Sequence, residues 1–179
     1  MIATFVVQVE DKPGVLNRVS SLFRRRAFNI ESLTVGRTDR PGVSRMTIVV
    51  DTDEYGVRRL EANLYKLVNV LRVDDVTVAP AVYRELAMIK VATNSETRTH
   101  VMQLADVFRA RVVDVAPDSL VIESTGTEDK IDGLLDVLRP FGVIEMARTG
   151  RLAMARGPKS AAAAPTKTEY VPDNISYSV

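Results

Sequence analysis

The stretch EDKPGVL, residues 10–16, separates two segments whose apolar residues recur with different periods. Before it, Phe5, Val7 and Val9 fall on one face of an alternating pattern, which predicts a half-buried β-strand. After it, apolar residues return at helical spacing over residues 14–26, namely Val15, Leu16, Val19, Leu22 and Phe23. EDKPGVL is therefore predicted to form a strand-to-helix turn.

The residue types of this turn allow two interpretations. Asp11 is a suitable helix N-cap, and Pro13 suits the first helical position because its missing N–H is not needed there. Gly14 costs roughly 1 kcal/mol in a helix relative to alanine, but it leaves neighbouring backbone N–H groups open to approach. The turn is either a helix cap alone or an anion site with an acidic side chain beside it.

The same order of elements occurs twice along the chain. A strand, a helix, two strands, a helix that starts near Asp53 and a final strand fill the first half, and the order restarts after Pro80. This β-α-β-β-α-β order predicts an α+β protein with two ferredoxin-like βαββαβ sandwiches in tandem. We assign residues 1–80 to the first domain and 81–156 to the second. Residues 157–179 lack a repeating apolar face and are predicted to form a disordered tail.

The second strand-to-helix turn, ATNSETRTH, differs from the first. Thr93 precedes Glu96 by three residues, which is the spacing of a capping box and would satisfy the free N–H groups of the helix internally. No Pro-Gly pair is present in this turn. If the first turn holds a ligand, the second is predicted to be closed to it, and the two copies would have separate roles.

Composition and charge exclude several classes of partner. The 179 residues include 24 basic and 23 acidic side chains with a net charge of +1, so charge alone implies no polyanion and no membrane surface. Cysteine is absent, and no apolar stretch approaches the ~20 residues that span a bilayer, so we expect a cytoplasmic protein. The predicted strand VSRMTIVV has no aromatic residue on which RNA bases could stack, which argues against nucleic-acid binding. The basic run 24–26 either offsets a helix dipole or forms a docking patch for an acidic partner surface.

No set of residues predicts catalysis or a metal site. His100 is the single histidine and cysteine is absent, so the histidine and cysteine ligands of a usual zinc site are missing, and a serine nucleophile has no second histidine to pair with. The glycine fingerprint of dinucleotide-binding folds is also absent. Acidic pairs such as Glu128 and Asp129 are best explained as solvated helix starts. An enzyme with an unrecognised carboxylate site is the alternative that these residues leave open.

The turn Asp-x-Pro-Gly-Val-Leu within a βαββαβ unit resembles the ACT domain, whose members bind small amino acids and regulate metabolic enzymes. A longer ordered set of segments resembles the regulatory small subunit of acetohydroxyacid synthase, also called acetolactate synthase. The set runs from residue 1 to about residue 157 and includes VEDKPGVLNRVSSLFRRRAFNIESLTVG, LYKLVNVLRVDD and KIDGLLDVLRPFGVIEMARTGRLAMARG. Such a long set in both copies is specific, whereas Pro-Gly-Val-Leu alone would be weak.

The resemblance implies a chain without catalysis of its own. It implies binding to a catalytic large subunit, activation of that subunit, and feedback inhibition by L-valine or a related branched-chain amino acid in the biosynthesis of valine, leucine and isoleucine. Thiamine diphosphate, magnesium and FAD are expected in the catalytic partner, and none in this chain. The second domain is expected to carry activation or docking. The alternative is a free-standing ACT-type amino-acid sensor that regulates another enzyme.

The resemblance also implies a homodimer whose first domains lie side by side with the effector between them. Carried over by position, one subunit provides Asp11, Gly14, Val15 and Leu16, and the other provides Asn29 and Ile30. In this hypothesis, backbone N–H groups around Gly14 bind the carboxylate of the amino acid, and Asp11 binds its ammonium group. Burying an isopropyl group against Leu16 and Ile30 would add roughly 1.5 to 3 kcal/mol.

One residue departs from the family pattern. Ala27 stands where glycine is expected, just past the first helix, and a left-handed turn there would cost alanine roughly 1 to 2 kcal/mol. Either the turn differs in this chain or the strain is tolerated, and the placement of Asn29 depends on which is true.

Overall fold

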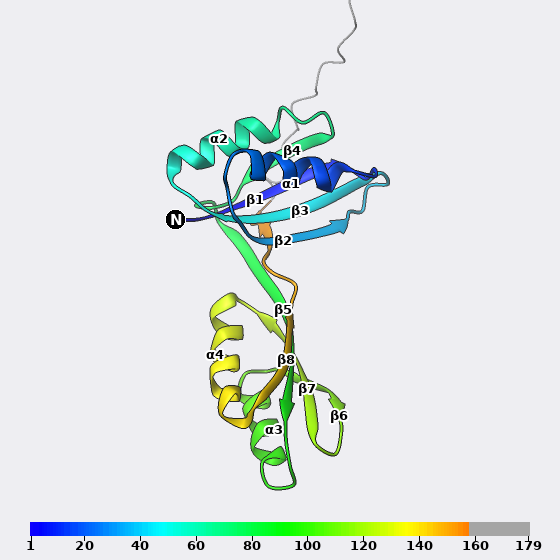
Figure 1. Ribbon diagram of the computed structural model, residues 1–179, viewed down its shortest axis with the longest axis vertical. Helices are drawn as coiled ribbons and strands as arrows, with labels where there is room; N and C mark the ends of the chain where they lie inside the picture. Colours follow the sequence, from blue (N-terminus) through cyan, green and yellow to red (C-terminus); the bar gives the residue numbers. More distant parts are fainter. Residues whose placement is uncertain (158–179) are drawn as a thin grey trace, which may run out of the picture.

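The computed structural model describes residues 1–157 and shows two sheet-and-helix units stacked end to end (Figure 1). The first unit comprises β1 (Ile2–Glu10), α1 (Val15–Arg25), β2 (Ile30–Arg37), β3 (Val43–Asp51), α2 (Glu54–Leu64) and β4 (Val70–Asp75). The second comprises β5 (Ala81–Ala92), α3 (Arg98–Val107), β6 (Arg111–Val115), β7 (Ser119–Gly126), α4 (Glu128–Leu138), the 3-10 helix η1 (Arg139–Phe141), β8 (Val143–Arg148) and β9 (Leu152–Ala155). The tail predicted for residues 157–179 lies outside the described residues from residue 158 onward.

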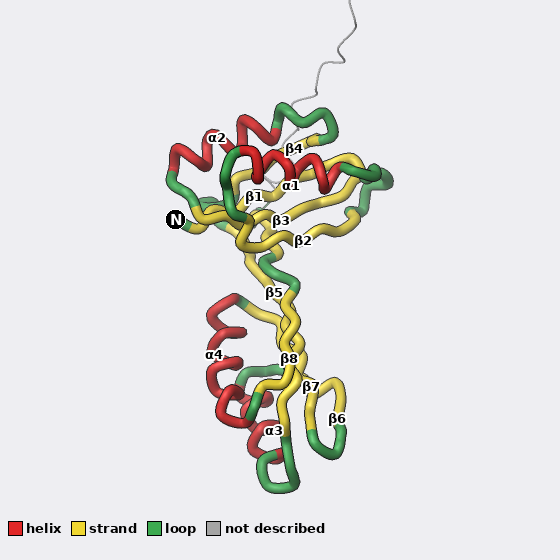
Figure 2. The backbone as a smooth tube through the Cα atoms, in the orientation of Figure 1, coloured by secondary structure: helices red, strands yellow, loops and turns green. Residues whose placement is uncertain are grey.

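The two sheets have the same topology. The strand order is β2-β3-β1-β4 in the first sheet and β6-β7-β5-β8 in the second, and all neighbours are antiparallel. Helices α1 and α2 cover one face of the first sheet, and α3 and α4 cover one face of the second (Figure 2). This is the split βαβ arrangement, so the predicted α+β fold with two ferredoxin-like sandwiches in tandem is confirmed.

Each unit has its own apolar core between sheet and helices. Phe5, Val7 and Val9 are buried in the first core as their alternation predicted, and Leu60 and Leu64 pack against them from α2. The second core contains Ile89, Ile122, Leu134 and Leu138, among others. Burying one such side chain contributes about 1.5–3 kcal/mol, so these cores hold the helices on their sheets. No helix within residues 1–157 has both the length and the apolar character needed to cross a lipid bilayer.

A ribbon of two short strand segments joins the units, and the sequence did not predict it. Residues 81–84, at the start of β5, pair with β9, whereas residues 85–92 of the same strand pair with β7 in the second sheet. Ala153 of β9 is buried against Val6 and Val76, on the face of the first sheet that the helices leave open. Burial lowers the pKa of Arg45, which donates from Nη2 to the Ala153 carbonyl at 2.5 Å.

Helix α1 starts differently from the prediction. Its N-cap is Gly14, which has a φ of +83°, and no side chain caps the helix. The prediction that Asp11 caps α1 and that Pro13 occupies its first position was therefore wrong, because the left-handed turn at Gly14 separates both residues from the helix. At α2 the expected start is confirmed, since Asp53 is the N-cap and accepts the Gly56 N–H at 2.6 Å.

The start of α3 also corrects a prediction. The side chain of Asn94, and not that of Thr93, accepts the backbone N–H groups of Glu96 and Thr97, at 3.0 and 2.8 Å. Asparagine readily bonds the backbone two and three residues further on, and it thereby takes the place of the predicted capping box. The turn remains internally satisfied, as the sequence indicated, through a different residue.

The left-handed turn after α1 is present despite the alanine. Ala27 has a φ of +59°, so of the two alternatives the strained turn is the one observed. The Ala27 N–H donates to Arg24 O at 3.1 Å and the Phe28 N–H to Phe23 O at 3.0 Å, which together form a Schellman motif. Arg109 has a φ of +51° at the same position after α3. Both repeats thus end their first helix with the same strained turn.

Candidate functional site

The turn between β1 and α1 is fixed by backbone hydrogen bonds. The Asp11 N–H donates to Gly42 O of the β2–β3 loop at 2.8 Å, and the Val15 N–H donates to Lys12 O at 3.3 Å. A Cβ atom on Gly14 would meet nothing within 4 Å, so its positive φ and not lack of space favours glycine. In this conformation the first turn of α1 lies at the surface beside Asp11.

Three chemically different groups lie together at this turn. The first N–H groups of a helix have no carbonyl partner within it and form its positive end, and no side chain caps α1. The Asp11 carboxylate is at the surface, with Oδ2 3.5 Å from Arg37 Nε. Leu16, one of the predicted effector contacts, is 43% exposed, whereas Val15 is buried and its N–H already donates to Lys12 O. The surface therefore offers hydrogen-bond donors, an anion and an apolar side chain.

The neighbouring carboxylate, Glu10, is more closely engaged than Asp11. Glu10 Oε2 lies 3.2 Å from Lys12 Nζ and accepts Asn69 Nδ2 at 2.5 Å. Arg18, on the exposed side of α1, donates in turn to Asn69 Oδ1. This network fixes the end of β1, and it leaves Asp11 as the carboxylate directed towards the open surface.

Asn29 and Ile30 lie at the opposite end of α1. Asn29 is exposed and donates from Nδ2 to Glu31 Oε1 at 2.6 Å, and Ile30 is partly buried against the first core. An α-helix of 11 residues is about 16 Å long, so one chain does not bring these two residues to the turn that holds Asp11. The six predicted site residues thus form two groups at opposite ends of α1 on one chain.

The strand that carries Ile30 lies at an edge of its sheet. β2 pairs with β3 on one side, and within the described residues no strand pairs with its other side. Val35, near the end of β2, is 43% exposed. An exposed edge strand presents free N–H and C=O groups to another strand, which is one way for two copies to associate.

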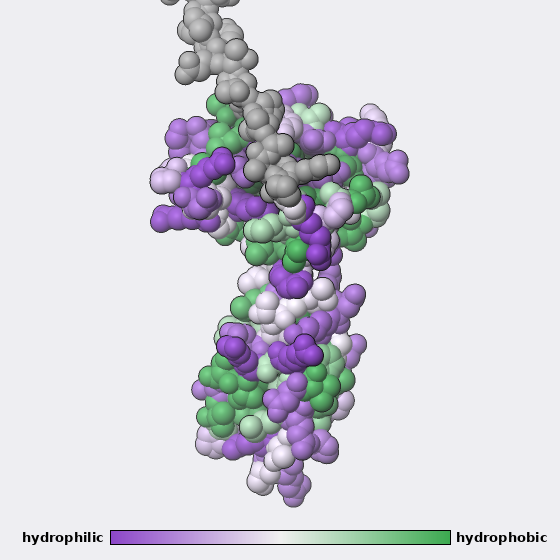
Figure 3. All heavy atoms as spheres, turned by 180° about the vertical axis from the view of Figure 1, so that it is seen from behind, coloured by the Kyte–Doolittle hydropathy of each residue, from purple (hydrophilic) through white to green (hydrophobic). Residues whose placement is uncertain are grey.

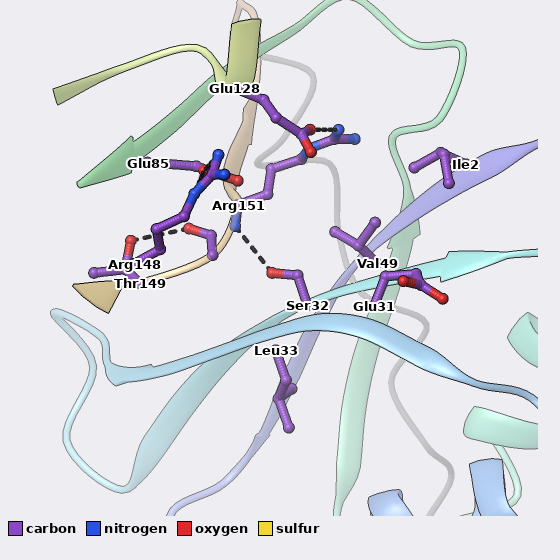
Figure 4. A pocket seen from close by; sticks show the side chains of 11 residues that line it. Ile2, Glu31, Ser32, Leu33, Val49, Glu85, Glu128, Arg148, Thr149 and Arg151 are labelled. Carbon is purple, nitrogen blue, oxygen red and sulfur yellow. Dashed lines mark hydrogen bonds and ion pairs between the residues drawn. The ribbon is translucent and has the colours of Figure 1, made fainter. Parts of the chain in front are cut away.

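A cavity of about 510 Å³ separates β2 from the second unit (Figure 4). Arg148 lies in its wall, with Nη2 2.6 Å from Glu85 Oε2 and Nη1 2.7 Å from Asp132 Oδ1. Burial lowers the pKa of Arg148, but hydrogen bonds and charges from Glu85 and Asp132 outweigh burial and raise that pKa above its ordinary value. Glu128, interpreted as a solvated helix start, is the exposed first residue of α4 and also pairs with Arg151. Sequence reasoning missed this cluster because its members are far apart in the chain.

The second unit exposes several large apolar side chains. Figure 3 shows hydrophobic residues on both flanks of this unit, separated by a polar strip. Met88, Val115 and Ile144 are among the exposed residues, and they come from three different strands. Exposed apolar side chains of this kind are able to contact another protein.

Two tandem βαββαβ units with an uncapped Pro-Gly turn in the first define a protein of the ACT-domain class. A family model described as "AHAS small subunit-like ACT domain" matches residues 5–72, and one described as "Small subunit of acetolactate synthase" matches residues 84–157. The chain therefore belongs to the family of acetolactate synthase small subunits, as the resemblance predicted. Membership in this family supports a regulatory role.

Individual relatives agree with this assignment over nearly the whole chain. The chain is 51% identical to a probable acetolactate synthase small subunit of Archaeoglobus fulgidus, over 87% of this chain and 98% of that protein. It is 48% identical to the acetolactate synthase small subunit of Mycolicibacterium smegmatis, over 90% of this chain and 95% of that protein. The crystal structure of the acetolactate synthase small subunit from Thermotoga maritima superimposes with a TM-score of 0.84 at 38% identity, covering 88% of this chain and 99% of that one.

Proposed function

We propose that this chain binds the catalytic large subunit of acetolactate synthase, raises its activity and makes it sensitive to feedback inhibition by valine. The observation that carries the effector part is the start of α1. Gly14, with a φ of +83°, leaves the helix without a side-chain cap, and the exposed Asp11 carboxylate and Leu16 lie beside it. These groups complement the carboxylate, the ammonium group and the aliphatic side chain of valine.

The ligand would bind in a definite orientation. Its carboxylate accepts hydrogen bonds from the N–H groups of the first turn of α1 that follow Val15, whose own N–H already donates to Lys12 O, because the helix end favours an anion. Its ammonium group pairs with Asp11 in place of Arg37. Its isopropyl group packs between Leu16 of one copy and Ile30 of a second copy, and Asn29 of that copy bonds the polar end.

A dimer with two-fold symmetry supplies both halves of the site. The two groups of residues lie at opposite ends of α1, so antiparallel apposition of two first domains brings each group against the other group of its neighbour. Two equivalent sites result. The free edge of β2 supports this arrangement, because pairing of two such edges would satisfy their open backbone groups.

The catalytic steps belong to the large subunit in this proposal. Thiamine diphosphate, magnesium and FAD would bind there, and the second domain of this chain would contact that subunit through exposed apolar residues such as Met88 and Ile144. Valine inhibits only if it binds one state of the complex more tightly than another, since equal affinity for both states shifts nothing.

The test is the rate of acetolactate formation by the matching catalytic subunit, alone and with this chain, in a valine titration. We expect the rate to rise on addition of the chain and to fall as valine increases. A rise without a fall would contradict the valine site while leaving the subunit role intact. No rise would contradict activation and favour a free-standing amino-acid sensor.

A further inference from the structure

The segment between β8 and β9 is docked directly on β2. The Arg151 N–H donates to Ser32 Oγ at 3.0 Å, and Thr34 Oγ1 donates to the Thr149 carbonyl at 3.1 Å (Figure 4 shows the first bond). A Cβ atom on Gly150 would lie 2.2 Å from Ser32 Oγ, and Gly150 has a φ of +79°. Close approach and backbone conformation therefore both require glycine at this contact.

The side chain of Arg151 connects both units. Nη1 donates to Thr4 Oγ1 of β1 at 3.1 Å, and Nη2 pairs with Glu128 Oε2, in the first turn of α4, at 2.7 Å. Its Cζ also lies 5.3 Å from the centroid of the Tyr83 ring of β5. The Arg151 side chain is 21% exposed and the Glu128 side chain 50%, so Arg151 is largely covered while its ion pair with Glu128 remains open to water. A change in the position of β2 relative to α4 would have to stretch or break this set of bonds.

The contact begins two residues after the proposed effector residues. Ile30 pairs with Val50 and Ser32 with Val49, so the register shifts at Glu31, between them. A ligand that moves Ile30 would therefore act on the same strand, two residues from the Ser32 contact.

The cavity beside this contact gives the units room to move. Arg148 and Arg151, with Glu85 and Glu128, line it, and each of these charges already has an ion-pair partner. Paired side chains leave little for a charged ligand to bind. The space instead permits α4 to approach or leave β2 when the bonds to Arg151 change.

We propose that Ser32, Gly150, Arg151 and Glu128 form an interdomain latch that passes effector binding at the start of β2 to the second domain. The latch fixes the orientation of the two units, and the effector acts by favouring one orientation over another. The regulatory part of this inference rests on the proposed function. Arg151 and Glu128 are positioning residues, since neither contacts the ligand.

The orientation can be measured without the effector. The chain has no cysteine, so Ala62→Cys in α2 and Gln103→Cys in α3, both exposed, can carry spin labels in the full chain. Double electron–electron resonance should give a narrow distance distribution, and Glu128→Gln should broaden it. Asp136→Asn is the matched control, because it removes an α4 ion pair at 3.2 Å to Arg139 that does not cross between units. An unchanged distribution in Glu128→Gln would overturn the latch.

The coupling is measured in the complex with the catalytic subunit. In Glu128→Gln we expect the valine dissociation constant from calorimetry to change by less than threefold, while inhibition at saturating valine falls by at least half. The conservative variant Glu128→Asp keeps a carboxylate for Arg151 and leaves its contacts with Thr4 and Tyr83 in place, so it should retain most of the narrow distribution and of the inhibition. A broadened distribution with full inhibition would overturn the regulatory role of the latch. Absence of valine binding to the unmodified chain would instead contradict the proposed effector, and the distance distribution would still decide whether the latch exists.

Discussion

Replacing Asp11 with alanine tests whether this side chain binds the effector or only stabilises the fold. In the structure Asp11 makes one side-chain ion pair, 3.5 Å from Arg37 Nε, and the two side chains are 41% and 88% exposed. Exposed pairs of this kind stabilise a fold by about 0–1 kcal/mol. For a chain of this size, that loss lowers the melting temperature by at most about 2–4 °C.

The same substitution should have a much larger effect on the affinity for valine. Asp11 is proposed to bind the ammonium group, and a hydrogen bond to a charged group contributes about 1.5–3 kcal/mol. Loss of this contact corresponds to a dissociation constant that is roughly 10- to 150-fold weaker, which abolishes binding at ordinary effector concentrations. Feedback inhibition should disappear with it, while activation of the catalytic subunit persists.

Calorimetric titration with valine and a thermal melt followed by circular dichroism measure the two effects. Arg37→Ala is the matched control, because it removes the same ion pair and leaves the Asp11 carboxylate in place. We expect this variant to melt like Asp11→Ala and to bind valine at least as tightly as the unmodified chain. Unchanged affinity in Asp11→Ala, or equal loss in both variants, would refute the assignment of Asp11 to the ammonium group.

Three further substitutions test the fold around the site. Ala27→Gly relieves the strain of the left-handed turn, where φ is +59°, and should stabilise the chain by about 1 kcal/mol. A thermal melt measures this gain, and an unchanged melting temperature would contradict it. Gly150→Ala places a methyl group 2.2 Å from Ser32 Oγ and should destabilise by about 1–3 kcal/mol; hydrogen exchange in β2 should accelerate, and slow exchange would argue against tight docking. Val35→Arg replaces an exposed apolar side chain of the β2 edge strand with a charge that would lose its water in the interface, and it should convert dimers to monomers in sedimentation; a persistent dimer would place the interface elsewhere.

Local patterns predicted most of the fold. The alternation of Phe5, Val7 and Val9 and the helical spacing around Leu60 each depend on which face of an element is buried, and both were confirmed. The end of α1 was left between two alternatives, because alanine disfavours the left-handed turn that Ala27 nevertheless adopts. By contrast, β9 exists only through pairing with residues 81–84, some seventy residues away, and four residues carry too short a pattern to predict it.

The candidate site was predictable in composition but not in geometry. Asp11 and Gly14 were identified from their residue types, yet Gly14 and not Asp11 is the N-cap, because glycine adopts a left-handed conformation there that no spacing rule anticipates. Leu16 fits the apolar period of α1 and is nevertheless exposed, since it sits at the margin of the stripe in the first turn. The pairing of Arg151 with Glu128 depends on the placement of two domains, which local patterns do not contain.

Strand β5 has a consequence for how this chain can be divided. Its twelve residues contain no glycine or proline. Residues 81–84 form the ribbon with β9 against the first sheet, and residues 85–92 form a central strand of the second sheet. A cut at residue 80 would therefore uncover Val6 and Val76, the apolar residues that Ala153 covers. The excised first unit would expose an apolar patch on the sheet face that carries no helices. It should therefore self-associate unless the ribbon is retained. Reagents built from this unit should accordingly include residues 81–84 tethered to residues 152–155 by a short loop.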